Sequence, residues 1–164
     1  MNILSRYHLR SDKRRELIED LRISLNGFEG LNLKKRPMEV IKTEKFDEII
    51  FFDGKAAFFR LDGKYILTLK GAIEFRGKGL DLGLDVVVDM GAVRFISNGA
   101  DVMAPGVVEA DERIKEGEMV IVVDETHKMP LGIGIALKVG KEMEKGKGKV
   151  VKSLHHVGDD LWNL

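Results

Sequence analysis

The first clear pattern of apolar and polar positions is that of an amphipathic helix. Apolar residues recur at intervals of three and four, which places them on one face of a helix. The pattern predicts a helix over residues 12–25, with Ser11 as its N-cap and Asn26-Gly27 as its left-handed stop. The apolar stripe consists of Leu17, Ile18, Leu21 and Leu25. Three arginines fall outside that stripe: Arg14, Arg15 and Arg22.

Two Asp-Gly dipeptides divide the apolar segments that follow. Asp53-Gly54 and Asp62-Gly63 each lie between two apolar runs. A two-residue hairpin turn needs positive φ at both central positions, which Asp-Gly tolerates, so each dipeptide predicts a β-hairpin. The predicted strands cover residues 38–43, 49–52, 56–61 and 65–69. We therefore predict an N-terminal α+β domain over residues 1–84, in which the helix packs on an antiparallel meander.

A glycine-rich stretch over residues 76–83 separates this domain from the second half of the chain. The strands predicted there cover residues 85–89, 118–124, 131–139 and 149–156. A short helix is expected over residues 90–97, ending at Asn98-Gly99. The strand over 131–139 is split by Gly132 and Gly134, so this half contains about five short strands. With few helices and many glycines, that pattern favours a small barrel over residues 85–164. The predicted fold class of the whole chain is α+β.

Charge is unevenly distributed along the chain, although the formal net charge is zero. Residues 1–84 carry 17 Lys and Arg against 13 Asp and Glu, and residues 85–164 carry 10 against 14. The segment 138–152 holds six lysines and two acids, whereas the segment 101–125 holds eight acids and two basic residues. Such a domain would present a basic edge and an acidic face, and local potential governs contact with phosphate.

The sequence lacks the residues of common catalytic and metal centres. It contains no cysteine, which excludes disulfides, thiolate zinc sites and iron–sulfur clusters. No glycine-rich loop ends in Lys-Ser or Lys-Thr, as a P-loop requires. His155 and His156 are adjacent, and a strand would point them to opposite faces. We therefore expect no enzymatic activity, no cofactor and no bound metal.

Composition also bears on where the protein works. No apolar run approaches the roughly 20 residues that a membrane span requires. Residues 1–10 lack the apolar core of a signal peptide, so we expect a cytoplasmic protein with no membrane partner. The chain has no glutamine and only five asparagines, while a third of its residues are charged. This composition is typical of a thermophile.

Four segments of the second half form a specific combination. They are VDMGAV at 88–93, NGADVMAPGV at 98–107, GEMVIVVD at 117–124 and LGIGIA at 131–136. Their order and spacing resemble those of the PUA domain, which is named for pseudouridine synthases and archaeosine transglycosylases. Together with the helix and meander before them and GDDLW at 158–162, they make the chain similar to the malignant-T-cell-amplified-sequence family and its archaeal relatives.

The resemblance implies a pre-PUA domain followed by a PUA pseudo-barrel. It further implies a non-catalytic RNA-binding protein of translation, which contacts the tRNA acceptor end, small-subunit ribosomal RNA, or both. A translation-factor protein partner is also implied, a density-regulated protein in the eukaryotic members.

RNA contacts are expected around the 98–107 loop and in the lysine-rich segment. Gly99 and Gly106 leave room for a strand to approach main-chain amides, while Met103 offers an apolar surface for a splayed base. The arginines of the first helix are expected to add phosphate contacts. The expected RNA-binding residues are Arg94, Asn98, Gly99, Ala100, Met103, Pro105, Gly106, Lys138, Lys141 and Lys145.

Other interpretations stay open at this point. The same glycines, with Pro105, are the residues that a tight barrel corner would use. The protein could be an accessory subunit that delivers RNA to a modification enzyme. It could also be an adaptor whose acidic face, over residues 101–125, binds a basic protein.

Overall fold

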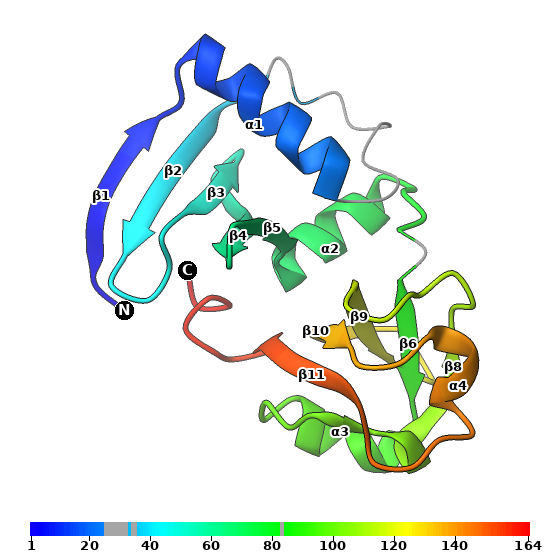
Figure 1. Cartoon of the computed structure of the whole chain (residues 1–164). Coiled ribbons are helices and arrows are strands. Elements are labelled where there is room, and N and C mark those ends of the chain that lie inside the picture. The colour runs from blue at the N-terminus through cyan, green and yellow to red at the C-terminus, as the bar shows by residue number, and fades with distance from the viewer. Residues whose placement is uncertain (25–32, 34–35, 83) are drawn as a thin grey trace. The chain divides into compact units, whose positions relative to one another are not determined.

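The computed structural model describes residues 1–24, 33, 36–82 and 84–164 (Figure 1). The chain divides into two compact units, Met1–Leu82 with Leu164, and Gly83–Asn163. Each unit has a sheet of its own, and the predicted α+β class, a meander followed by a near-barrel, is confirmed. Leu25 and the helix stop expected at Asn26-Gly27 lie outside the described residues. The exact domain limits, 1–84 and 85–164, stay a prediction.

The N-terminal sheet is a five-stranded antiparallel meander in sequence order. Its strands are β1 (Ile3–His8), β2 (Met38–Thr43), β3 (Ile49–Phe52), β4 (Lys55–Leu61) and β5 (Lys64–Leu67). Asp53 and Gly54 have φ of 49° and 78°, and Asp62 and Gly63 have 49° and 76°, as the two predicted hairpin turns require. Strand β1 was not predicted, because five of its six residues are exposed and show no alternation of polarity.

Two helices accompany this sheet, α1 (Ser11–Ser24) in contact with β5 and α2 (Leu69–Gly77) in contact with β4. The predicted apolar stripe of α1 is confirmed, since its described members, Leu17, Ile18 and Leu21, are buried. Arg14 N–H donates to Arg10 O at 2.8 Å, so Arg10 and not Ser11 accepts the first helical hydrogen bond.

Helix α2 replaces the end of a predicted strand. The strand expected over residues 65–69 ends at Leu67, because the next residue, Thr68, begins the helix. Its hydroxyl accepts a hydrogen bond from Gly71 N at 2.9 Å and donates one to Ala56 O at 2.7 Å. The cap therefore depends on a carbonyl of β4, which no local sequence pattern reveals.

The C-terminal unit is built on a six-stranded sheet in the order β7-β11-β10-β9-β6-β8. Its strands are β6 (Asp85–Val88), β7 (Val102–Met103), β8 (Val107–Ala110), β9 (Met119–Asp124), β10 (Pro130–Ala136) and β11 (Lys149–His156). Among the described strands of this sheet, β6 and β9 are the one pair that is parallel. The edge strands β7 and β8 are joined by the three-residue 3-10 turn η2 (Ala104–Gly106), so the sheet must curl until its edges meet.

Helix α3 (Met90–Ile96) and helix α4 (Gly140–Met143) complete this unit. The short helix predicted over residues 90–97 is confirmed. The strand predicted over 85–89 stops at Val88, because Asp89 caps α3. The strand predicted over 131–139 stops at Ala136, because Val139 already precedes α4. Strands β7 and β8 were not predicted, since they have only two and four residues.

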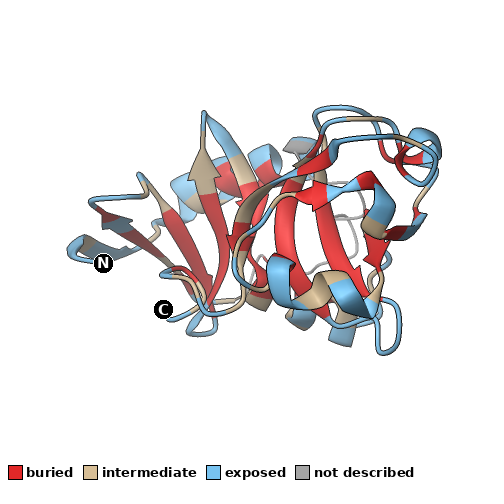
Figure 2. Ribbon diagram, turned by 90° about the horizontal axis from the view of Figure 1, so that it is seen from below, coloured by how far each residue is buried: buried red, intermediate tan, exposed pale blue. Residues whose placement is uncertain are grey.

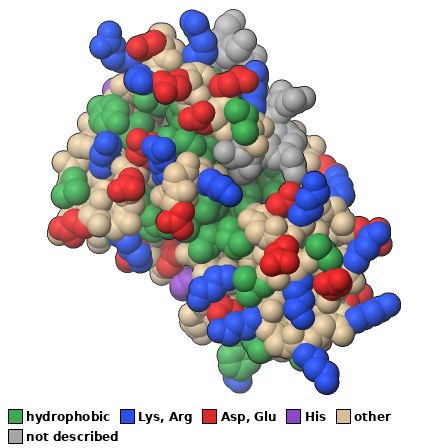
Figure 3. Space-filling view, viewed as in Figure 1, with side chains coloured by type: hydrophobic (Ala, Val, Ile, Leu, Met, Phe, Trp, Pro, Cys, Tyr) green, Lys and Arg blue, Asp and Glu red, His purple; other side chains and the backbone are tan. Residues whose placement is uncertain are grey.

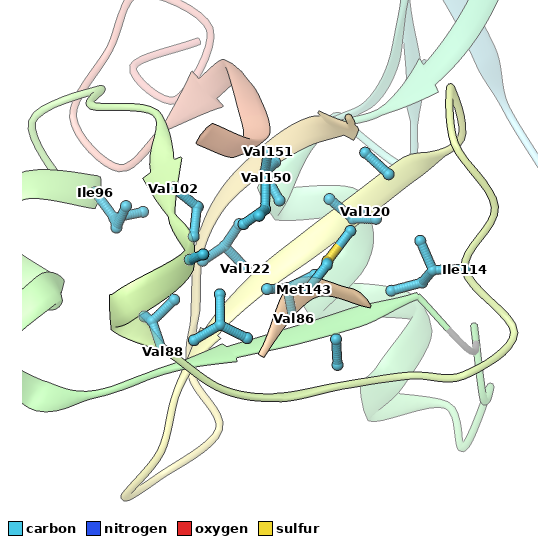
Figure 4. Packing of buried hydrophobic residues seen from close by; sticks show 14 of the residues in the cluster. Val86, Val88, Ile96, Val102, Ile114, Val120, Val122, Met143, Val150 and Val151 are labelled. Carbon is cyan, nitrogen blue, oxygen red and sulfur yellow. The ribbon is translucent and has the colours of Figure 1, made fainter. Parts of the chain in front are cut away.

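The core of the C-terminal unit consists mainly of valines that several strands contribute. In Figure 2, the buried residues, drawn in red, lie mainly on the strands. Figure 4 shows members of this buried cluster, among them Val86, Val88, Val122, Val150 and Val151, which come from several strands of the unit. Strands of β-branched residues pack well against one another on a pleated surface, so this composition suits a curled sheet.

Glycine allows β11 to lie close to β10. A Cβ atom on Gly134 would lie 2.4 Å from Val151 Cγ1 and 2.5 Å from Lys152 O. The register of the pair also shifts between Ile133 and Gly134. The Gly-x-Gly-x-Ala pattern of the sequence therefore has a structural cause: backbone of β11 occupies the space that a side chain at 134 would need.

We expect Gly134→Ala to lower the free energy of unfolding by about 2–3 kcal/mol, because the added methyl forces β10 and β11 apart. The control is Gly106→Ala in the same unit, where a Cβ would meet only Ala92 Cβ, at 3.4 Å. Urea unfolding followed by circular dichroism measures both. Equal urea midpoints for wild type and Gly134→Ala would show that the close approach of β11 to β10 does not require glycine at position 134.

Candidate nucleic-acid interface

The turn η2 is the centre of the predicted interface, and hydrogen bonds attach it to two other segments. Asp89 N–H donates to Gly106 O at 3.0 Å, which holds the turn beside the start of α3. Ala104 N–H donates to Gly148 O at 2.8 Å, which attaches the turn to the lysine-rich segment. The structure therefore brings α3, the turn and the lysine-rich segment together, although they are distant in sequence.

Helix α3 is short but is fixed at both ends. Its N-cap, Asp89, accepts a hydrogen bond from Ala92 N at 2.9 Å. At its C-terminus, Gly99 adopts φ of +88°, and the N–H groups of Gly99 and Ala100 donate to Ile96 O and Phe95 O. Ile96 is buried, so the opposite face of the helix is held toward solvent.

That exposed face carries a stacked pair, Arg94 and Phe95. The Arg94 guanidinium carbon lies 4.6 Å from the centroid of the Phe95 ring, and Phe95 is 53% exposed. Asn98 Nδ2 donates to Arg94 O at 2.8 Å and is itself exposed. A flat aromatic ring with an adjacent guanidinium is the kind of surface on which unpaired bases stack. Phe95 was not predicted as a site residue, although its position next to Arg94 on a capped helix was a usable signal.

Gly99 and Gly106, both predicted to contact RNA, differ in whether the fold requires glycine at their positions. A Cβ on Gly99 would lie 2.8 Å from His156 Nε2, and its positive φ disfavours other residues, so the fold itself requires glycine there. Gly106 has no positive φ and would meet only Ala92 Cβ, at 3.4 Å. The fold does not itself require glycine at position 106, so close approach of an RNA backbone would explain why a glycine is there.

Apolar side chains flank the turn on its outer side. Met103 is 46% exposed and lies opposite Lys149 in the pairing of β7 with β11. Pro105, in the first turn of η2, is exposed, and so is Ala100. The turn thus presents apolar surface next to main-chain atoms.

The lysine-rich segment folds back on itself beside the turn. Lys138 Nζ donates to Lys147 O at 3.2 Å, and a Cβ on Gly146 would lie 3.1 Å from Lys138 Nζ and 3.8 Å from Ala104 Cβ. Lys141, in α4, and Lys145 are exposed. Figure 3 shows basic side chains projecting from the margin of the C-terminal unit.

Two further lysines share one carboxylate. Asp101 Oδ2 lies 3.1 Å from Lys149 Nζ and 3.6 Å from Lys152 Nζ, while Oδ1 accepts from Ser153 N at 2.8 Å. The Ser153 N–H, followed by the Lys149 ammonium, holds the pKa of Asp101 below its usual value despite partial burial. Asp101 therefore ties β11 to the loop before β7, which removes it from the acidic face considered in the sequence analysis.

Other acids of the 101–125 segment also serve the fold. Asp124 is buried and accepts hydrogen bonds from the N–H groups of Thr126, His127 and Met129. Asp111 pairs with Arg113 at 2.8 Å. The acidic surface available to a partner is therefore smaller than the sequence indicated.

The end of β11 is anchored to the C-terminal turn by histidines and one aspartate. His155 is buried, and its Nδ1 lies 2.8 Å from Asp159 Oδ2, which also accepts from His156 N at 3.1 Å. Asp159 Oδ1 accepts from Trp162 N at 2.9 Å, and the Trp162 side chain is half-buried. His156 points to the other face, where Nδ1 lies 3.1 Å from Ser97 O, so it supports the C-terminus of α3.

Within residues 1–24, 33, 36–82 and 84–164, no three His, Asp or Glu side chains are grouped so that they could hold a metal ion. None of the helices in the same residues is long and apolar enough to cross a membrane.

Comparison with known proteins identifies relatives of this chain. Residues 85–158 match the model of the PUA domain. An uncharacterized protein of Methanocaldococcus jannaschii is 46% identical over 165 residues, which cover 100% of this chain and 99% of that protein. Translation machinery-associated protein 20 of Saccharomyces cerevisiae is 33% identical over 80% of this chain and 74% of its own length.

Two further comparisons reach the same group of proteins. Human malignant T-cell-amplified sequence 2 is 26% identical over 80% of this chain and 73% of its own length. A PUA-domain structure from Aeropyrum pernix K1 superimposes with a TM-score of 0.83, at 28% identity over 96% of this chain and 89% of that one. The resemblance inferred from the sequence is confirmed.

We expect the C-terminal unit to lose stability as the pH falls from about 4 to about 2, because Asp159 becomes protonated. Burial acts to raise the pKa of Asp159, but hydrogen bonds from His155, Trp162 and His156 outweigh it and lower the pKa to about 2. A carboxyl with a lowered pKa stabilises the fold above its unfolded pKa, near 4, and that contribution is lost as the pH drops through 2. Its size is about 1–2 kcal/mol, allowing for partial exposure of the side chain.

The measurement is urea unfolding between pH 2 and pH 6. Asp159→Asn should be less stable than wild type at pH 6 and should show a smaller loss on acidification. An unchanged pH dependence in Asp159→Asn would contradict this assignment.

Proposed function

Because this chain belongs to the family of PUA-domain proteins that includes translation machinery-associated protein 20, we propose that it binds RNA in translation without catalysing a reaction. The PUA domain is an RNA-binding fold, and the printed name of the yeast relative associates that protein with the translation machinery. The RNA proposed here is the acceptor end of tRNA, small-subunit ribosomal RNA, or both. Such a role would place the protein in the cytoplasm.

The observation that carries the proposal is the hydrogen-bonded position of η2 between α3 and the lysine-rich segment. On one side, the Arg94–Phe95 stack offers a surface for a base. On the other, exposed Lys141 and Lys145 carry charges suited to phosphate. A single strand laid across the turn would meet stacking surface, main-chain atoms and cations in succession.

The chemistry of these groups favours an unpaired strand over a duplex. Aromatic stacking requires bases that are splayed out of a helix, which loops and ends provide. Free RNA ends and loops are therefore the preferred class of ligand.

The decisive survey is crosslinking in cells, followed by sequencing of the bound RNA. Recovery of tRNA 3′ ends or of small-subunit RNA supports the proposal. Recovery mainly of RNA that carries modified nucleotides at one site favours the accessory-subunit alternative. Absence of RNA favours the adaptor alternative.

Reversing the charge of Lys138, Lys141 and Lys145 to Glu should weaken binding of tRNA and small-subunit RNA by about tenfold or more at low salt. The salt slope should decrease in magnitude by up to about 2, because each lost contact with a single strand contributes about 0.7. Fluorescence anisotropy over a range of KCl concentrations measures both quantities.

The matched control reverses three exposed lysines of the N-terminal unit, Lys42, Lys45 and Lys64, which changes the net charge equally. Its affinity should stay much closer to that of wild type. If both triple variants bind as wild type does, the lysine-rich segment is solvated surface only.

Replacing Phe95 by Ala should cost about 1–3 kcal/mol of RNA binding, the value of one base stacked on an aromatic ring. Phe95→Tyr should retain most of the affinity, because the ring remains. Thermal melting checks that both variants fold, which is expected since the side chain is half exposed. Equal binding by the Ala and Tyr variants would remove Phe95 from the interface.

A further inference from the structure

Helix α1 of the N-terminal unit carries two arginines along one line of its surface, the basic line, and three acids along another, the acidic line. Arg15 and Arg22 lie on the basic line with Ser11 and Ile18, at spacings of three and four residues. Asp12, Glu16 and Asp20 lie on the acidic line, each four residues from the next. Two ion pairs at a spacing of three residues, Lys13 with Glu16 and Arg22 with Glu19, join oppositely charged side chains of the helix.

A groove of about 500 Å³ follows the basic line. The described residues that line it all belong to α1: Ser11, Arg14, Arg15, Ile18, Glu19 and Arg22. Arg14 is half-buried and Ile18 is buried, so the groove has an apolar floor between charged walls. A second groove, of about 370 Å³, follows the acidic line and includes Glu16 and Asp20. Among the described residues that line the basic groove, Glu19 is the one acid.

Arg15 and Arg22 are accessible to a ligand in this groove. Among the residues that the structure describes, no carboxylate forms an ion pair with Arg15, which is exposed. Arg22 lies 3.6 Å from Glu19, and the two side chains are 39% and 66% exposed, respectively. Exposed pairs of this kind contribute little, so phosphate can replace Glu19 at Arg22 with small loss.

The groove alternates charge with apolar surface along its length. Arg15 and Arg22 are seven residues apart, about 10 Å along the helix axis, with Ile18 between them. The backbone of a nucleic-acid strand alternates in the same way, with anionic phosphates separated by less polar riboses. Arginine also matches phosphate by paired N–H donors, which a lysine cannot do.

We propose that the basic groove of α1 is a second RNA-binding site, at which Arg15 and Arg22 contact phosphates of one strand on either side of Ile18. The proposal rests on the proposed function only in that RNA is the ligand. It assigns to the N-terminal unit a direct part in binding, separate from the PUA interface.

The test compares Arg15→Glu with Lys13→Glu in the full-length chain. Both residues are exposed on α1 and both changes alter the net charge equally, but Lys13 pairs with Glu16 on the other flank. The probe is a 20-nucleotide single-stranded RNA, titrated by anisotropy over a range of KCl concentrations. Arg15→Glu should weaken binding about five- to tenfold and lower the magnitude of the salt slope by about 0.7, whereas Lys13→Glu should stay within about twofold of wild type.

The same titrations in the Lys138, Lys141 and Lys145 variant separate the two proposals. If the variant keeps part of its affinity and Arg15→Glu removes it, the second site is supported. If Arg15→Glu and Lys13→Glu bind alike in both backgrounds, the second site is wrong, while the PUA interface can still stand. If wild type binds no RNA, the proposed function fails as well.

Inorganic phosphate serves as the competitor that distinguishes a strand from a free anion. At equal ionic strength, phosphate should displace RNA no better than chloride does, because one phosphate cannot span Arg15 and Arg22. Stronger displacement by phosphate would show a simple anion site and overturn the proposal.

Discussion

The seam of the C-terminal sheet, where η2 joins the edge strands β7 and β8, is the constraint on which the rest of that unit depends. Strands β7 and β8 lie at opposite edges of a six-stranded sheet, yet only η2 separates them in sequence. In a flat sheet these edges would lie about 24 Å apart, at five spacings of 4.8 Å. Three residues cannot bridge that distance, so the sheet curls and encloses its valines. The seam itself stays at the surface, where α3 and the lysine-rich segment are attached to it by hydrogen bonds.

Some residues near the seam stabilise the fold, whereas others are exposed to solvent. Gly99, Asp101 and Asp159 are used by the fold: one accommodates His156, and the two carboxylates anchor β11 at different points along its length. Phe95 and Met103, in contrast, expose about half of their surface and gain little from the core. Keeping such side chains exposed costs solvation free energy, and binding a ligand is one way in which that cost is offset.

The parts of the fold that follow local rules could be predicted from the sequence. The Asp53-Gly54 turn is an example, because positive φ at both positions is a property of the dipeptide. Elements that depend on distant partners could not. Helix α2 begins where it does because the Thr68 hydroxyl reaches Ala56 O, and β7 is a strand only because it pairs with β11. The loop residues of the candidate site were predicted from the resemblance, whereas Phe95 was not predicted, because a seven-residue helix gives too short a pattern to show which face is buried.

The net charge of zero does not describe the local charge of this protein, because basic and acidic side chains are unevenly distributed among its helices and strands. On β11, Lys149 and Lys152 share the carboxylate of Asp101, whereas no described carboxylate pairs with Lys141 or Lys145. On α1, Arg22 pairs with Glu19, whereas no described carboxylate forms an ion pair with Arg15. At physiological salt the Debye length is about 8 Å, so a phosphate senses only the nearest side chains. An overall neutral protein can therefore bind RNA locally while repelling neither acidic nor basic neighbours at longer range.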